Sequence, residues 1–101
     1  MKQKGIDSFV NQRIWIIGAS SGIGEACAQA FIKAGAGVAL SSRRAEKLNT
    51  IAQSAEPGQA LVLPLDVTQH EQLISAYQGI LKAWGDLDLI CLLYTSDAAD
   101  E

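Results

Sequence analysis

The segment GASSGIG, which begins at Gly18, contains the residue types that most clearly suggest chemistry. A tight turn can begin at Gly18, a ligand can approach the backbone at Gly22, and a helix can pack closely on a strand at Gly24. If a helix starts here, its free N–H groups and positive dipole end form a site for a pyrophosphate. Ser20 and Ser21 can add hydroxyl donors. The segment therefore predicts a phosphate-binding loop, provided that a strand precedes it and a helix follows it.

The flanking residues supply that context. The run RIWII, residues 13–17, is rich in β-branched and aromatic side chains and is typical of a strand buried on both faces. After the glycines, apolar residues recur at helical spacing, which predicts an amphipathic helix that ends at Gly35 and Gly37. Its predicted buried face comprises Ile23, Ala26, Cys27, Ala30, Phe31 and Ala34. An ordinary glycine turn is the alternative, and the strand before and helix after make it the weaker one.

The alternation of strands and helices continues to residue 90. Strands are expected at 38–40 and 60–65, with Pro64 near a strand end or edge, and a fourth apolar run begins in GDLDLI at 85–90. One further helical face comprises Leu48, Ile51, Ala52 and Ala55, and another comprises Leu73, Tyr77, Ile80 and Trp84. Thr68 and Glu71 match a capping box before the latter helix. This order predicts an α/β fold with a parallel sheet and helices on its faces.

Three blocks at matching spacing resemble the short-chain dehydrogenase/reductase family: the glycine loop, SSRRAEKL at 41–48 and LDVT at 65–68. The family's loop has the form TGxxxGIG, and Ile17 stands here in the usual threonine position, which removes a hydroxyl that helps brace the turn. The resemblance covers about residues 11–90. It implies a truncated Rossmann-type doubly wound parallel sheet of about four strands and three helices, with residues 1–90 forming the N-terminal half of a dinucleotide-binding domain.

The end of the second strand indicates which dinucleotide is bound. A carboxylate there suits the ribose of NAD, whereas this chain has Ser42 and Arg43, and an arginine can grip the 2′-phosphate of NADP. We therefore expect NADP rather than NAD. For Arg44 we favour a position in a solvated corner of the chain over a role in phosphate binding. Asp66 resembles the family aspartate that contacts the adenine amino group, with the Val67 backbone beside it, although an ordinary turn aspartate is the alternative. The predicted cofactor-binding set is Gly18, Ser20, Ser21, Gly22, Ile23, Gly24, Ser42, Arg43, Asp66 and Val67.

The catalytic pair of the family is not found. The family uses a tyrosine four residues before a lysine, but Leu81 follows Tyr77 at that spacing and Ala98 follows Tyr94. No catalytic residue is predicted, and the chain itself is expected to be inactive. The resemblance implies that the parent enzyme transfers hydride between the nicotinamide and a small carbonyl or alcohol substrate. A non-catalytic dinucleotide-binding sensor and a short nonfunctional product remain as alternatives, because fold alone does not fix function.

The final segment, CLLYTSDAADE at 91–101, departs from the family pattern. The codons TGT CTC TTA TAC ACA TCT GAC GCT GCC GAC, followed by GA, encode nearly all of it and resemble a transposon-type sequencing-library adapter. We therefore predict that this tail is non-native, with a divergent natural terminus as the alternative. In the family's sheet order the fourth strand is interior. Its edge would be unpaired in this chain, and we expect marginal stability and aggregation.

Composition bounds the remaining possibilities. The chain has 101 residues, 49% of them hydrophobic, and 8 basic against 11 acidic side chains give a net charge of −3. One small globular domain fits this length, and the slight acidity argues against nucleic acid. No apolar run suits a membrane span, and two cysteines without a CxxC spacing favour the cytoplasm. No metal site is predicted, and a homo-oligomeric parent stays open. His70 is expected at the surface, and Cys27, Tyr77 and Trp84 in the core.

Overall fold

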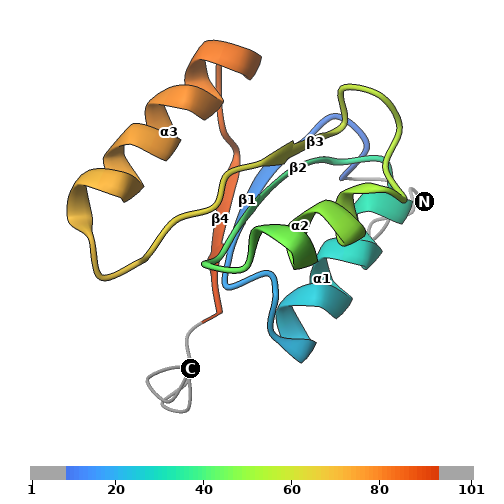
Figure 1. Ribbon diagram of the computed structural model, residues 1–101. Helices are drawn as coiled ribbons and strands as arrows, with labels where there is room; N and C mark the ends of the chain where they lie inside the picture. The colour runs from blue at the N-terminus through green and yellow to red at the C-terminus, as the bar shows by residue number, and fades with distance from the viewer. Residues whose placement is uncertain (1–8, 94–101) are drawn as a thin grey trace.

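A computed structural model describes residues 9–93 as four strands that alternate with three helices (Figure 1). The elements are β1 (Arg13–Ile17), α1 (Gly22–Lys33), β2 (Gly37–Ser41), α2 (Ala45–Ala52), β3 (Ala60–Val62), α3 (His70–Trp84) and β4 (Leu89–Leu92). All strand pairs are parallel, in the order β3-β2-β1-β4. The predicted α/β fold with a four-stranded parallel sheet and three helices is therefore confirmed.

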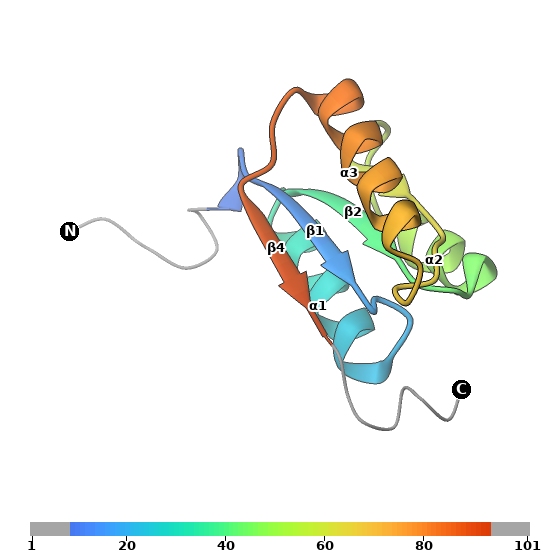
Figure 2. The same cartoon turned by 90° about the vertical axis from the view of Figure 1, so that its left-hand side faces the viewer.

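The central strand β1 has an apolar core on each side, because successive side chains of a strand point to opposite faces. Ile14 and Ile16 pack with buried residues of α1 and α2, and Trp15 and Ile17 pack with Ile80 of α3. Helices α1 and α2 accordingly cover one face of the sheet and α3 covers the other (Figures 1 and 2). The continuous apolar run of β1 is explained by this burial on both faces.

A buried hydrogen bond joins the two central strands on the α3 side. The indole N–H of Trp15 donates to the Ser41 hydroxyl at 2.8 Å, and both side chains are nearly inaccessible to water. Tyr77 of α3 stacks on the Trp15 ring, with centroids 6.4 Å apart, yet Tyr77 is 41% exposed. The prediction that Tyr77 lies in the core was therefore wrong: it covers the core from outside. His70 is exposed, as predicted, and Trp84 is half-buried.

The buried face of α1 is rotated by one residue from the predicted one. Gly24, Ala28 and Ile32 are buried. Ala34, just after the helix, is buried as predicted, and Cys27 and Phe31 pack against this core, but Ile23, Ala26 and Ala30 are exposed. The reason is the backbone contact between the start of α1 and the end of β1, which requires Gly24 to face the sheet. Small residues carry too little hydrophobic signal to reveal such a face from periodicity.

The segment around β3 also differs from its prediction. The strand comprises Ala60–Val62 rather than 60–65. The Leu63 N–H nevertheless donates to the Leu40 carbonyl of β2 and the Leu65 N–H to the Ser42 carbonyl just beyond β2, and Pro64 between them has no N–H to donate. The capping box at Thr68 was wrong, because Gln69 is the N-cap of α3 and the Thr68 hydroxyl donates to Asp66 instead.

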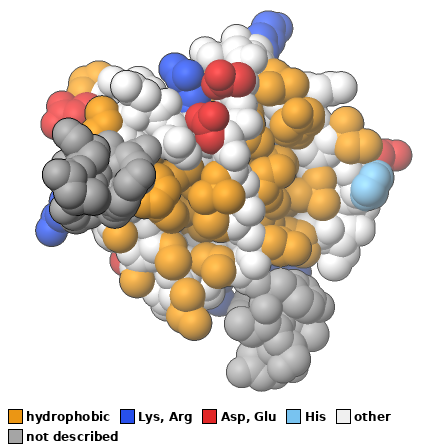
Figure 3. All heavy atoms as spheres, turned by 180° about the vertical axis from the view of Figure 1, so that it is seen from behind, with side chains coloured by type: hydrophobic (Ala, Val, Ile, Leu, Met, Phe, Trp, Pro, Cys, Tyr) orange, Lys and Arg blue, Asp and Glu red, His pale blue; other side chains and the backbone are white. Residues whose placement is uncertain are grey.

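The outer edge of β4 carries exposed apolar side chains. Leu89, Ile90 and Leu92 are 40%, 50% and 62% exposed, and Ile74 of α3 is 47% exposed. β4 lies at the rear of Figure 1, and Figure 3, seen from that side, shows hydrophobic side chains spread over the middle of this face. Within the described residues β4 pairs only with β1. An unpaired apolar edge of this kind favours self-association.

We predict that Ser41→Ala destabilises the fold by about 1 to 3 kcal/mol, because it leaves the buried Trp15 N–H without an acceptor. Urea unfolding measures the effect. Ser54→Ala is the control, since the Ser54 hydroxyl bonds to Gln29 and to the Ile51 carbonyl at the surface. Equal losses in the two variants would show that the buried bond contributes nothing special.

We also predict that Ile90→Lys reduces self-association of the chain, because a lysine on an edge strand opposes strand-to-strand pairing. Val10→Lys is a matched control, since Val10 and Ile90 are each 50% exposed but lie on different elements. Sedimentation velocity should show more monomer for Ile90→Lys and no change for Val10→Lys. A monomeric wild-type chain would contradict the expectation.

Candidate functional site

The turn from β1 into α1 is anchored on the neighbouring strand. The N–H groups of Gly18 and Ala19 both donate to the Ser41 carbonyl, at 2.8 and 3.1 Å. Gly18 has a φ of +95°, in the left-handed region that favours glycine. The loop therefore leaves the carboxyl end of β1 in a conformation that glycine permits and that β2 holds in place.

Ser21 caps the amino end of α1. Its Oγ accepts the Gly24 N–H at 3.0 Å and donates its own proton to the Gly18 carbonyl at 2.9 Å, while the Glu25 N–H donates to the Ser21 carbonyl. In the described part of the chain the N–H groups of Gly22 and Ile23 have no acceptor, as expected for the first turn of a helix. Two donors at the positive end of the α1 dipole are thus available to an anion.

The three glycines of the loop have different spatial surroundings. A Cβ at Gly24 would collide with the Gly18 carbonyl oxygen, and a Cβ at Gly18 would collide with the Leu93 carbonyl oxygen. A Cβ at Gly22 would meet nothing within 4 Å. Gly18 and Gly24 are therefore required by packing, whereas Gly22 borders open space. A cradle with free N–H donors and one open side fits a pyrophosphate.

The end of β2 presents two basic side chains from a well-ordered turn. Ser42 is 7% exposed, and its Oγ accepts the Arg44 N–H at 3.1 Å. Its carbonyl accepts the Leu65 N–H at 2.8 Å, which joins this turn to the segment after β3. Arg43 and Arg44 are both exposed. Ser42 thus shapes the turn, and the cations follow it at the surface.

Asp66 lies just beyond β3 and is bound by its neighbours. Its Oδ1 accepts the Thr68 hydroxyl at 2.7 Å and the Thr68 N–H at 2.9 Å. The Thr68 hydroxyl, and next its N–H, lower the pKa of the Asp66 carboxyl; partial desolvation opposes this, and the charge of Arg43 lowers the pKa a little further. That influence places Arg43 near Asp66. Val67 packs partly buried against the α3-side core.

The structure gathers the predicted residues at one end of the sheet. They follow β1, β2 and β3, and because these strands are parallel their carboxyl ends lie at the same edge, where ligands of such sheets bind. In Figure 1 the loops that follow β1 and β2 both lie at the lower end of the sheet. Sequence reasoning missed Thr68, which it assigned to a helix cap, and the Leu93 carbonyl, which lies against Gly18.

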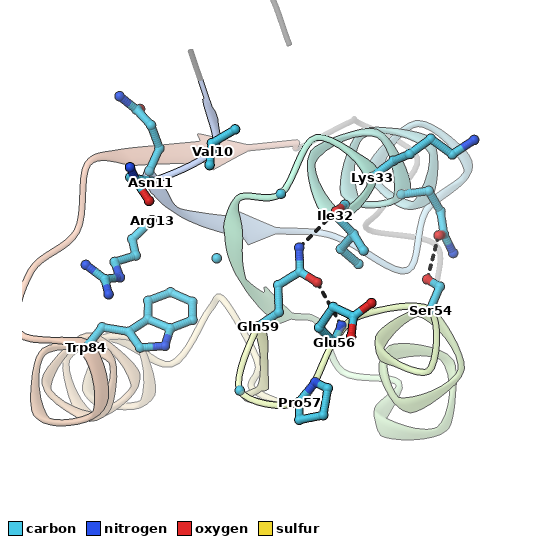
Figure 4. A pocket seen from close by; sticks show the side chains of 15 residues that line it. Val10, Asn11, Arg13, Ile32, Lys33, Ser54, Glu56, Pro57, Gln59 and Trp84 are labelled. Carbon is cyan, nitrogen blue, oxygen red and sulfur yellow. Dashed lines mark hydrogen bonds between the residues drawn. The ribbon is translucent and has the colours of Figure 1, made fainter. Parts of the chain in front are cut away.

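A groove of about 910 Å³ lies at the opposite end of the sheet (Figure 4). It borders Arg13 and Gly37, at the amino ends of β1 and β2, and contains none of the predicted cofactor-binding residues. The Gln59 amide fills part of it and donates to the carbonyls of Ile32 and Ala36, each at 2.8 Å. These bonds join the end of α1 to the residue before β3, so Gln59 has a structural role in the wall of this groove.

Other kinds of site are not found among residues 9–93. They contain no group of three His, Cys, Asp or Glu side chains that could hold a metal ion, and none of their helices is long and apolar enough to cross a membrane. Cys27 and Cys91 are free thiols. Burial raises the pKa of the Cys91 thiol, and the electrostatic effect of Cys27 raises that pKa further. No tyrosine in this part of the chain precedes a lysine by four residues.

Of the predicted non-native tail, residues 91–93 belong to the part of the chain that the structure describes. Cys91 and Leu92 form the end of β4, in register with Ile16 and Ile17, and the Leu93 N–H donates to the Ile17 carbonyl at 2.9 Å. Residues 94–101 lie outside the described residues. The prediction that 91–101 derives from an adapter therefore stays a prediction, as does the boundary at residue 90.

Solved structures with a similar fold include two reductases that contain a nicotinamide cofactor. L-sorbose reductase from Gluconobacter frateurii, in complex with NADPH and L-sorbose, superimposes with a TM-score of 0.70 at 28% identity, over 83% of this chain and 34% of that one. The 3-ketoacyl-(acyl-carrier-protein) reductase from Brucella melitensis, in complex with NADH, has a TM-score of 0.72 at 28% identity, over 78% and 32%.

Sequence comparison reaches the same family. An uncharacterized oxidoreductase of Listeria innocua is 40% identical over 84 residues, which cover 81% of this chain and 34% of that protein. The chain spans between about a quarter and a third of the length of the curated relatives that it matches. The sequence model of the short chain dehydrogenase family matches residues 12–92. From β1 to β4, therefore, the chain belongs to the short-chain dehydrogenase/reductase family.

Proposed function

We propose that this chain is the NADP-binding part of an oxidoreductase that moves hydride between a nicotinamide and a small carbonyl or alcohol substrate. The observation that carries the proposal is the glycine loop, in which the Gly22 and Ile23 N–H groups point from the amino end of α1 beside an open surface. The cofactor, when bound, supplies the hydride chemistry. Cytoplasmic location belongs to the same proposal and is supported by the two free thiols.

Different residues of the chain would bind different parts of the adenosine half of the cofactor. The N–H groups of Gly22 and Ile23, with the Ser20 hydroxyl nearby, would bind the pyrophosphate. The Ser21 hydroxyl is already used inside the loop, so its contribution is to hold the loop in shape. The Asp66 carboxylate and the Val67 backbone would contact the adenine.

The preference for NADP rests on Arg43. Relatives crystallised with NADPH and with NADH both superimpose on this chain, so membership of the family does not choose between them. Ser42 stands where a carboxylate would repel a 2′-phosphate, and the exposed Arg43 follows it beside the site. A planar guanidinium can bind a phosphate through paired, charge-assisted hydrogen bonds.

A non-catalytic dinucleotide-binding sensor is the second candidate. Absence of a tyrosine and lysine pair at the family's spacing from the whole parent protein would favour it, because fold alone does not fix function. The sensor and the reductase bind the same ligand, and they differ in whether the whole protein oxidises or reduces a substrate. Turnover of NADPH with a panel of small carbonyl compounds, measured on the full parent protein, separates them.

We predict that the chain binds adenosine 2′,5′-bisphosphate at least roughly tenfold more tightly than adenosine 5′-phosphate, a difference of about 1.4 kcal/mol. Arg43→Gln should remove this preference, whereas Arg44→Gln should keep most of it. Isothermal titration calorimetry at low salt measures the affinities, because salt screens exposed charges. A 2′-phosphate preference that survives Arg43→Gln would contradict the assignment of Arg43.

The two glycines of α1 should respond differently to alanine. Gly22→Ala should leave the free energy of unfolding nearly unchanged but weaken adenosine 2′,5′-bisphosphate binding roughly tenfold or more, because its Cβ enters the open side of the cradle. Gly24→Ala should instead destabilise the fold by about 1 to 3 kcal/mol, since its Cβ meets the Gly18 carbonyl. Calorimetry and urea unfolding separate the two effects. Unchanged binding in Gly22→Ala would place the phosphate elsewhere.

A further inference from the structure

Ser41, the last residue of β2, accepts hydrogen bonds from two different parts of the chain. Its side chain is fully buried, and its Oγ accepts the indole N–H of Trp15 at 2.8 Å. Its carbonyl accepts the N–H groups of Gly18 and Ala19, at 2.8 and 3.1 Å. A single residue therefore joins a buried tryptophan of β1 to the loop that follows β1.

From Gly18 the hydrogen bonds continue to the start of α1. The Gly18 carbonyl accepts the Ser21 N–H at 3.2 Å and the Ser21 hydroxyl at 2.9 Å. The Ser21 Oγ in turn accepts the Gly24 N–H at 3.0 Å. The position of Gly18 therefore determines the position of the first helical turn, whose Gly22 and Ile23 N–H groups are the proposed phosphate donors.

The Trp15 ring is held in one orientation by its surroundings. It is 3% exposed and lies in the buried cluster with Leu65 and Ile80, on the α3 side of the sheet. The Tyr77 ring stacks on it, with centroids 6.4 Å apart and an angle of 19° between the planes. An indole N–H can only donate. The packed ring therefore presents one donor, in a fixed direction, to the Ser41 hydroxyl oxygen.

We propose that Trp15 is a positioning residue for phosphate binding, and that it acts through Ser41 on the loop after β1. Without the indole donor, the Ser41 hydroxyl can turn toward a nearby backbone group, as serine side chains commonly do. The carbonyl that holds the Gly18 and Ala19 N–H groups then loses a restraint, and the donors of the first helical turn shift with the loop. The inference rests on the proposed function, because the anion is taken to be a phosphate of the dinucleotide.

The turn that carries Arg43 is held separately from this loop. The Ser42 Oγ accepts the Arg44 N–H, and the Ser42 carbonyl accepts the Leu65 N–H. Loss of the indole donor of Trp15 should consequently weaken the binding of a 5′-phosphate, which the loop would hold. It should leave unchanged the binding of a 2′-phosphate, which Arg43 would hold. A general loss of stability would not distinguish the two phosphates.

The test compares adenosine 2′,5′-bisphosphate with adenosine 2′-phosphate, by calorimetry on the 101-residue chain. Trp15→Phe, which keeps an aromatic ring but lacks the donor, should weaken binding of the bisphosphate roughly three- to tenfold and leave that of the 2′-phosphate unchanged. Ser41→Ala should do the same, and the double variant should lose no more than either single one, because all three remove one bond. Trp84→Phe is the matched control, since Trp84 lines the groove at the opposite end of the sheet. It should change neither affinity.

Amide hydrogen exchange, measured by NMR, gives a second readout that needs no ligand. The Gly18 and Ala19 amides should exchange several-fold faster in Trp15→Phe, relative to the Gly37 amide. The Gly37 N–H donates to the Gln12 carbonyl at the other end of the sheet, so it reports general stability. Equal acceleration of all three amides would show that Trp15 stabilises the whole fold and has no particular effect on the loop.

The outcomes separate this inference from the proposed function. A bisphosphate affinity that is unchanged in Trp15→Phe, or an equal loss for the two compounds, would overturn the inference and leave the proposed function standing. A wild-type chain that folds but binds the bisphosphate no more tightly than the 2′-phosphate would show that the loop holds no phosphate. That result would overturn both.

Discussion

The contact between Gly24 and the Gly18 carbonyl is the constraint on which the candidate site depends. It brings the amino end of α1 against the residue that follows β1 at a distance that no side chain at Gly24 allows. That approach turns Gly24 toward the sheet and rotates the buried face of α1 to Gly24, Ala28 and Ile32. It also brings the free N–H groups of the first helical turn to the edge of the sheet.

Hydrogen bonds between neighbouring loops extend this constraint across the sheet. The Ser41 carbonyl accepts the N–H groups of Gly18 and Ala19, and the Ser42 carbonyl accepts the N–H of Leu65. The loops after β1, β2 and β3 are thereby joined at the carboxyl ends of parallel strands. Arg43 and Asp66, which are far apart in sequence, come close enough for the charge of one to affect the pKa of the other.

The two sides of the sheet differ in how completely they are covered. The side of α1 and α2 has the larger buried cluster, while on the other side α3 covers Trp15 and Ile17, and Tyr77 is left partly exposed. Ile90 and Leu92, at the β4 edge, remain accessible to water. Several of the exposed apolar side chains therefore lie on β4 and α3, while Ile23, at the start of α1, is 64% exposed beside the glycine loop.

Local patterns in the sequence determined the order of the elements, the parallel α/β class and the composition of the glycine loop. β1 was predicted at its observed limits, because an apolar run between polar and glycine residues is a local signal. The buried face of α1, the exposure of Tyr77 and the pairing of Thr68 with Asp66 were decided only by the tertiary structure. The first two depend on how segments distant in sequence pack together, which the spacing of apolar residues does not reveal. The third depends on which of two nearby partners accepts the hydrogen bond of a polar side chain. Threonine suits both a helix cap and an aspartate turn, and only the path of the chain after β3 directs its hydroxyl to Asp66.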